Sequence, residues 1–390
     1  MTTQPFYIVS LLIKQPTWGG KYIAKFKKIT DPKVSLTNIG QSYELAKDSV
    51  LIAEPTTNLP FLLASANDTD HPQWHGPKVE GLNIQELIES NPEGVLGKKI
   101  VKKSGSQMPL LNKFTQAKEN SYQVHVALGR EFDHWQHKPE SWYYFENGKA
   151  TIGLKEGINL KQYQQRCQDV YQKSLQLSQQ VRKQELKVES ARQQLADFIN
   201  QDHPSNYVNT VYPPQNSMVD LSNGGIHHSW ESDSDLPRGN ILYEVQLDQR
   251  DDVSSIRGFD QGKIKDNGDI RNVAINDYFT ALNIDGEYNQ PEQYLKTPLK
   301  KEEGGATISH IFDNPSYQLT QIEFAGQYRG TETQLDQKFH HLFVKEGGVV
   351  ITWGDQEWPL AQGQSLFVPA NCDNYQLTAS QETIILKTTG

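Results

Sequence analysis

The sequence predicts a mainly β protein with two β lobes and one long helical segment. Short runs rich in β-branched and aromatic residues recur along most of the 390 residues, and Gly, Pro, Asn and Asp separate them. The exception is the segment from Gln162 to Asn200, which contains no Gly or Pro and is dense in Gln, Lys, Glu, Leu and Val. The chain is too long for one simple core, so we expect more than one domain.

Composition and charge narrow the functional classes. Apolar residues make up 36% and charged residues 22%, which is typical of a folded protein. The formal net charge of −9 and the lack of a dense Lys/Arg patch argue against a nucleic-acid partner. The N-terminal apolar segment is too short to span a bilayer, and two separated cysteines, Cys167 and Cys372, indicate neither a disulfide framework nor a metal motif. We expect a cytoplasmic protein without a membrane partner, as a monomer or weak homo-oligomer.

The first part of the chain is expected to be mostly strands. FYIVSLLIKQ predicts a strand that ends in a tight turn at PTWGG, and IGQSYELA and SVLIAEP predict further short strands. Within residues 81–99, NIQELIESNPEGVLGKK predicts a short helix with Asn83 as its N-cap. YYFENGKATIGL predicts a β-hairpin, because Asn147-Gly148 can take the positive-φ turn positions.

The helical segment, residues 160–200, carries one apolar stripe at three-four spacing, formed by Val170, Leu177, Val181, Val188, Leu195 and Phe198. Two interpretations are open: a coiled coil that binds a partner, or a helical cap that packs on the protein's own sheet. The stripe is short and interrupted, which favours the cap.

The charged, glycine-containing run Lys300–Gly305 indicates a boundary, which gives domains at 1–300 and 301–390. After it, short β runs recur at regular spacing, as in a small sandwich or barrel. His340 and His341 are adjacent and should face opposite sides of a strand, so they do not form a metal-ligand cluster. We expect this lobe to be structural.

The stretch from Ser121 to Trp142 contains three residue types that bind metals. Gln123 and His125 are two positions apart, so in a strand both project from the same side, and Glu140 follows a polar turn. On its own, a single Gln-x-His is more often an ordinary strand that carries a surface histidine.

A second histidine pair follows two glycines. Gly224-Gly225 allows a close backbone turn that delivers His227 onto the end of a strand, while His228 should face the other way. In the next strand, NILYEVQL, Glu244 on an inward face would need a charged partner, a nearby metal or a raised pKa; otherwise it faces water. Downstream arginines at 257 and 271 are suited to hold a phosphate through two hydrogen bonds.

A family resemblance rests on motifs that occur in a fixed order. WGG, IGQSYEL, PLLNKF, QVH, KPESWYYF, GGIHHSW, YEVQ, SSIRGFD and the C-terminal VKEGG…VPAN follow one another as in the type I phosphomannose isomerases, closest to their small bacterial branch. The chain resembles this family along nearly its whole length except Gln162 to Asn200. The resemblance implies a cupin-type β-sandwich or jelly-roll catalytic domain over 1–300 and a small cupin-like β domain without a metal site over 301–390.

The resemblance also implies a site. The family's metal ligands fall on Gln123, His125, Glu140 and His227, a set that suits one Zn²⁺ per chain, although Mn²⁺, Co²⁺ or Fe²⁺ would also fit. Its catalytic positions fall on Lys113, Glu244 and Arg257. The implied reaction interconverts mannose 6-phosphate and fructose 6-phosphate through a cis-enediol, with Glu244 as a candidate base.

Two departures from the family open alternatives. Val126 stands where proline usually follows QVH, and residues 258–263, GFDQGK, replace a Tyr-Asp-x-x-Arg run. The first alternative is a sugar-phosphate-binding or regulatory relative that keeps the metal with little or no turnover. The second is a cupin that acts on a different polyol or sugar.

Overall fold

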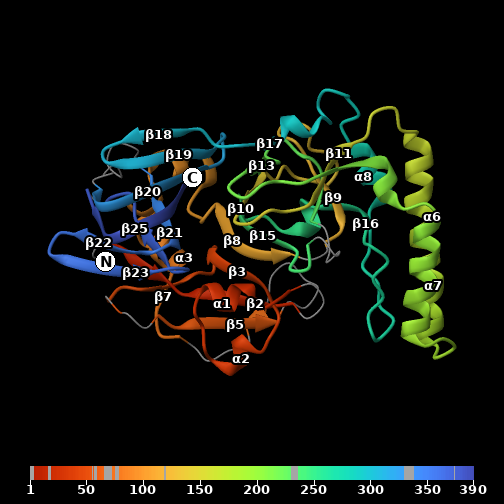
Figure 1. Cartoon of the computed structure of the whole chain (residues 1–390), viewed down its shortest axis with the longest axis horizontal. Coiled ribbons are helices and arrows are strands. Elements are labelled where there is room, and N and C mark those ends of the chain that lie inside the picture. Colours follow the sequence, from red (N-terminus) through yellow and green to blue (C-terminus); the bar gives the residue numbers. More distant parts are fainter. Residues whose placement is uncertain are drawn as a thin grey trace.

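The computed structural model describes residues 4–15, 19–54, 56, 59–65, 73–74, 79–117, 120–229, 236–328, 338–372 and 374–390. The described strands form three sheets, so the prediction of a mainly β fold is confirmed. The C-terminal strands and the long helices lie at opposite ends of the molecule (Figure 1). The tight turn expected at PTWGG falls partly on residues 16–18, outside the described residues.

Two of the sheets carry the residues of the candidate site. Nine described strands form one sheet, in the spatial order β17 (Leu295–Lys296), β13 (Met218–Asp220), β10 (Glu140–Tyr144), β15 (Asn240–Leu247), β8 (Leu110–Ala117), β3 (Ile39–Leu45), β2 (Ser10–Lys14), β5 (Phe61–Ser65) and β6 (Gln73–Trp74). Five described strands form the other, in the order β12 (Val208–Val211), β11 (Ala150–Leu154), β14 (Gly225–Ser229), β9 (Tyr122–His125) and β16 (Ile256–Phe259).

The third sheet combines the two ends of the chain. Its described strands run in the order β18 (Lys300–Glu303), β19 (Ala306–Asp313), β20 (Gln318–Tyr328), β25 (Gln376–Thr389), β21 (His340–Glu346), β24 (Ser365–Val368), β1 (Phe6–Ile8), β4 (Val50–Ile52) and β7 (Leu82–Asn83). In addition, β22 (Gly348–Trp353) pairs with β25, and β23 (Gln356–Ala361) pairs with β22. FYIVSLLIKQ is therefore two strands in different sheets and not one. The division of the chain at residue 300 stays a prediction.

Aromatic side chains join the third sheet to the nine-stranded sheet. The ring of Phe114 on β8 lies 4.9 Å from that of Phe145 and 5.9 Å from that of Phe343 on β21, measured between centroids. All three side chains are buried. This contact gives the nine-stranded sheet a rigid support on one face, while its other face remains available to line a cavity.

The described helices are α1 (Tyr22–Phe26), α2 (Pro32–Ser35), α3 (Ile84–Ser90), α4 (Pro92–Leu96), α5 (Lys98–Ser104), α6 (Leu160–Arg182), α7 (Val188–Gln201) and α8 (Ile275–Ala281), with 3-10 turns η1 (Pro204–Tyr207), η2 (Asp251–Val253) and η3 (Pro291–Gln293). None of them combines the length and apolar character needed to cross a membrane.

The helix predicted over residues 81–99 begins as expected but is shorter. The side chain of Asn83 accepts a hydrogen bond from the backbone N–H of Gln85 at 2.7 Å, which confirms its role as N-cap of α3. The helix then ends at Ser90, because Asn91 is extended and caps α4 before Pro92. Gly97, with φ of 98°, separates α4 from α5.

The hairpin predicted around Asn147-Gly148 is wrong. β10 pairs with β13 and β15 in the nine-stranded sheet, whereas β11 pairs with β12 and β14 in the five-stranded sheet. The connection is held by residues far along the chain: Asn147 accepts a hydrogen bond from the backbone of Gln215, and the N–H of Gly148 donates to the carbonyl of Pro213. The dipeptide therefore carries the chain from one sheet to the other.

The long helical segment forms two helices, α6 and α7, connected by a turn in which Gln184 has a positive φ of 60°. Their buried residues, including Val170, Leu177 and Leu195, belong to the same core as Val124 on β9. These contacts support the helical cap and not the coiled coil with a partner. The cap covers the outer side of the five-stranded sheet, near the strands that carry the candidate site (Figure 1).

The two adjacent histidines of the C-terminal lobe face opposite sides, as expected. Nδ1 of His340 lies 2.9 Å from the hydroxyl of Tyr375, and Nδ1 of His341 lies 2.9 Å from the side-chain nitrogen of Asn112. Each histidine thus packs into a different core.

Candidate active site

Strand β9 forms the centre of the candidate site. It lies between β14 and β16, and Gln123 is directly opposite His227 on one side and Arg257 on the other. Directly opposed residues of neighbouring strands share a face, so these three side chains project together. His125 follows two positions later on β9 and opposes Gly225.

The two glycines before His227 are required by the backbone. Gly224 has φ of 85° and Gly225 has φ of 110°, a backbone region that residues other than glycine rarely adopt. A Cβ on Gly224 would lie 2.6 Å from the carbonyl oxygen of His125, and one on Gly225 would lie 2.9 Å from the ring of Tyr294. The close turn expected from the sequence is confirmed, and it brings β14 against β9.

We expect Gly225→Ala to lower the free energy of unfolding by about 2 kcal/mol, because the new methyl group combines backbone strain with a steric clash. The displaced β14 should also weaken metal binding by misplacing His227. Urea unfolding and titration with Zn²⁺ measure the two effects. Gly286→Ala is the control, since a Cβ at that position meets open space; equal stability of the two variants would contradict the requirement for glycine.

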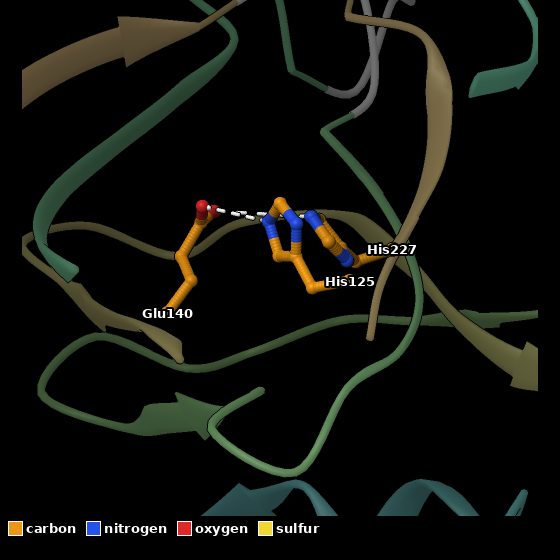
Figure 2. A group of neighbouring side chains, drawn as sticks. All are labelled: His125, Glu140 and His227. Atoms are coloured by element: carbon orange, nitrogen blue, oxygen red, sulfur yellow. Dashed lines mark hydrogen bonds and ion pairs between the residues drawn. The ribbon is translucent and has the colours of Figure 1, made fainter. Parts of the chain in front are cut away.

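His125, Glu140 and His227 form a compact buried cluster (Figure 2). Nε2 of His125 lies 3.0 Å from Oε2 of Glu140, and Nε2 of His227 lies 3.8 Å from Oε1 of the same carboxylate. One atom of each residue lies within 4.8 Å of the others. The side-chain N–H of Gln123 donates to Nε2 of His227 at 3.0 Å, so the fourth expected ligand is at the edge of the same cluster.

Backbone contacts fix the protonation of both rings. Nδ1 of His125 lies 2.7 Å from the carbonyl oxygen of Ser254, and Nδ1 of His227 lies 3.0 Å from that of Gly225. A carbonyl only accepts, so each Nδ1 carries a hydrogen and each Nε2 points into the cluster, where it can offer a lone pair to a bound cation. A lone pair that faces the Glu140 carboxylate at hydrogen-bond distance is repulsive unless a proton or cation lies between them. The donor set therefore fits a bound cation.

The electrostatics of the cluster favour a carboxylate beside neutral imidazole. Burial is the largest cause and the proximity of His125 the second, and they lower the pKa of His227 to about 4. Burial alone would raise the pKa of Glu140, but the hydrogen bond and charge of His125 hold it well below its usual range. The indole N–H of Trp142 donates to Oε1 of Glu140 at 2.8 Å and orients the carboxylate.

A buried ion pair lies on the nine-stranded sheet. Lys113 on β8 is directly opposite Glu244 on β15, and Nζ lies 3.0 Å from Oε1. Burial lowers the pKa of Lys113, but the charge of Glu244 and the other acidic groups nearby together outweigh it, and the net shift is upward. Burial raises the pKa of Glu244, against the opposing effect of Lys113. Of the two possibilities for Glu244, the inward face with a charged partner is the one found.

Arg257 belongs to a second charged group. Its guanidinium lies 2.8 Å from Oδ2 of Asp251, while Nζ of Lys138 lies 2.7 Å from Oδ1 of the same carboxylate. Neither Asp251 nor Lys138 is among the site residues predicted from the sequence. The spacing of Lys138 and Glu140 was the available signal, because residues two apart in extended chain face the same side.

One cavity of about 1090 Å³ connects these groups. Its walls include Gln123, Glu140, Lys113, Glu244 and Arg257, so it lies between the nine-stranded and five-stranded sheets. Basic side chains slightly outnumber acidic ones in its lining, although the chain as a whole has a net charge of −9. Such a cavity favours a small anionic ligand.

The other arginine singled out in the sequence lies at the far rim of the same cavity. Nη1 of Arg271 is 3.4 Å from Oδ1 of Asp260, in the segment after β16. It lines the cavity with Arg257 but belongs to a different ion pair.

Comparisons with known proteins agree with this architecture. Residues 327–387 match the family described as mannose-6-phosphate isomerase, cupin domain. No curated protein matches the chain by sequence. The structure is similar to mannose 6-phosphate isomerase from Bacillus subtilis, with a TM-score of 0.67, 16% identity and 99% of each chain covered.

Two further structures have similar scores. For the apo form of mannose 6-phosphate isomerase from Salmonella typhimurium, the match covers 100% of this chain and 100% of that one, at 13% identity and a TM-score of 0.63. A zinc-bound mannose 6-phosphate isomerase covers 98% of both chains, also at 13% identity and a TM-score of 0.63. At these identities the similarity establishes the fold, as the resemblance in the sequence implied. The chain therefore has the fold of the mannose-6-phosphate isomerases, and its residues 327–387 match the cupin-domain family of those enzymes.

Proposed function

We propose that the chain is a metal-dependent aldose-ketose isomerase that interconverts mannose 6-phosphate and fructose 6-phosphate. The observation that carries this proposal is the buried His125–Glu140–His227 cluster, whose carboxylate lines the same cavity as the Lys113–Glu244 pair. A cation site beside a group able to move a proton is what isomerisation of a sugar requires.

The proposed metal is Zn²⁺, one per chain, held by His125, Glu140 and His227. Gln123 would add its amide oxygen as a ligand after its side-chain amide rotates, which exchanges the positions of the amide oxygen and nitrogen. The zinc-bound relative supports this choice, and Mn²⁺, Co²⁺ and Fe²⁺ also accept such ligands. A divalent ion held there would supply Lewis-acid stabilisation of negative charge on the substrate oxygens.

Glu244 is the proposed base. Its carboxylate takes the C2 proton of open-chain mannose 6-phosphate and returns it to C1, with a cis-enediol between the two steps, while the hydroxyl proton of O2 is transferred to O1. The reverse transfer converts fructose 6-phosphate, and no electrons are gained or lost overall. Burial, which raises the pKa of Glu244, makes the carboxylate a stronger base than an exposed glutamate. Lys113 holds the carboxylate in position through its 3.0 Å contact and provides a positive charge beside the substrate.

Arg257 is the proposed phosphate contact, because a guanidinium binds phosphate through two parallel hydrogen bonds. We expect Arg257→Ala to raise the KM for mannose 6-phosphate by roughly 10- to 100-fold while metal content stays unchanged. Steady-state kinetics and metal analysis measure both. Arg250→Ala is the control, since Arg250 lies on the same segment but is exposed and pairs with Asp252; an equal rise in KM in both variants would remove Arg257 from this role.

The runner-up is a sugar-phosphate-binding or regulatory relative that keeps the metal. It is favoured by residues 258–263, where the sequence differs from the family and where Asp260 to Lys263 line the cavity.

An assay of the purified protein with mannose 6-phosphate separates the two functions. Formation of fructose 6-phosphate is followed with added Zn²⁺ and with a chelator, and binding of the sugar phosphate is measured by calorimetry in parallel. Turnover that depends on metal supports the isomerase. Binding without turnover at any metal loading would instead establish the binding relative.

A further inference from the structure

The segment that follows β16 forms one wall of the cavity and runs along the helical cap. Residues 260–266 and Arg271 line the cavity, and the segment lies beside α6 and α7 before it enters α8 (Figure 1). It begins three residues after Arg257, so it continues the side of the cavity where we place the phosphate. This is also the part of the site in which the sequence differs from the family.

Arg192 on α7 holds this wall at two points. Its Nε donates to the carbonyl oxygen of Ile264 at 2.8 Å, and its Nη2 lies 2.8 Å from Oδ1 of Asp266. Arg192 itself lines the cavity. The side chain of Asp266 is 92% exposed, so this pair contributes little, and the partly buried hydrogen bond to the Ile264 carbonyl is the contact that holds the segment.

Packing against α7 leaves the wall little freedom. Gly262 has φ of 69°, and a Cβ there would lie 2.5 Å from Cδ1 of Ile199 and 3.2 Å from Cδ2 of Leu195. The side chain of Ile264 is only 3% exposed and belongs to the core of the helical cap. The backbone of the wall is therefore pressed directly onto the helix.

Contacts farther along the segment lie away from the cavity. The hydroxyl of Ser178 on α6 donates to the carbonyl oxygen of Gly268 at 2.6 Å. Arg182 forms an ion pair of 2.7 Å with Asp269, in which the arginine side chain is 52% exposed. Exposed pairs of this kind contribute little to stability, so Arg182, at the end of α6, is a matched comparison for the hydrogen bond that Arg192 on α7 donates to the Ile264 carbonyl.

We propose that Arg192 is a positioning residue that fixes residues 260–266 as the outer wall of the cavity and thereby sets the affinity for the sugar phosphate. The inference rests on the proposed function and gives the helical cap a role in it. Because the hydrogen bonds of Arg192 go to Ile264 and Asp266, its loss loosens the wall without changing the groups that move the proton. Binding and chemistry should therefore respond differently.

In the test, Arg192→Ala should raise the KM for mannose 6-phosphate by about fivefold and leave kcat within about twofold of wild type. Arg192→Lys should recover part of the affinity, because an ammonium can still donate to the Ile264 carbonyl. Hydrogen exchange of the backbone amides of residues 262–266 should be faster in Arg192→Ala. Arg182→Ala should change neither KM nor exchange near the cavity.

The outcomes separate this inference from the proposed function. Unchanged KM and unchanged exchange in Arg192→Ala would overturn it, as would a fall in kcat at constant KM or an equal response in Arg182→Ala. If the wild-type protein neither turns over nor binds mannose 6-phosphate, the proposed function fails, and the exchange comparison alone decides whether Arg192 fixes the wall.

Discussion

Replacing His125 with alanine is expected to abolish metal binding and turnover together. The ring of His125 is buried, its Nδ1 is bonded to the carbonyl of Ser254, and its Nε2 faces Glu140 at 3.0 Å. Alanine removes one proposed ligand from a site that has few, so we expect affinity for Zn²⁺ and kcat/KM each to fall by roughly a thousandfold or more. Metal analysis after dialysis and steady-state kinetics measure the two losses.

The control for this variant is His310→Ala, which removes an exposed histidine from β19. It should retain both metal and activity. Circular dichroism and thermal unfolding establish that His125→Ala is folded, because the variant also leaves a small buried space. Full metal content or normal turnover in folded His125→Ala would contradict the proposed ligand set.

Glu244→Gln is expected to lower kcat by about 10²- to 10⁴-fold without loss of metal, because the amide has nearly the same shape but cannot accept the C2 proton. In the wild-type protein the base acts when it is deprotonated. Since burial raises the pKa of Glu244, the rate should fall as pH drops through a value above that of an ordinary glutamate. In Glu244→Gln this acid-side decrease should disappear from the residual activity.

Lys113 loses its buried partner in that variant, so a change in stability must be separated from the loss of a base. Glu303→Gln, on an exposed edge strand, provides the control for a carboxylate-to-amide change, and Lys113→Met combined with Glu244→Gln removes both charges of the pair. If Glu244→Gln retained wild-type kcat or the same acid-side decrease, another group would have to be the base.

Local chemistry explains which parts of the fold the sequence predicts correctly. Asn83 caps a helix because its side chain bonds a backbone N–H two residues away, and Gly224-Gly225 forms a close turn because only glycine fits it. The Asn147-Gly148 hairpin fails for the opposite reason. Its flanking strands pair with partners up to about a hundred residues away, and those contacts override the local turn preference.

The same distinction applies to the candidate site. Gln123 and His125 share a face because they are two positions apart in a strand, which the sequence alone predicts. The contact between Nδ1 of His125 and Ser254 and the bridge from Lys138 to Asp251 join segments more than a hundred residues apart. Such contacts depend on which distant segments the fold brings side by side, and the sequence carries no local signal for them.

The most direct test of the central claim is a titration of metal-free protein with Zn²⁺ while the conversion of mannose 6-phosphate is followed. We expect no turnover in chelator-treated protein, and then a rate that rises in proportion to added Zn²⁺ until one ion per chain is bound. Full turnover in protein without metal, or no turnover at any loading of Zn²⁺, Mn²⁺, Co²⁺ or Fe²⁺, would contradict a metal-dependent isomerase.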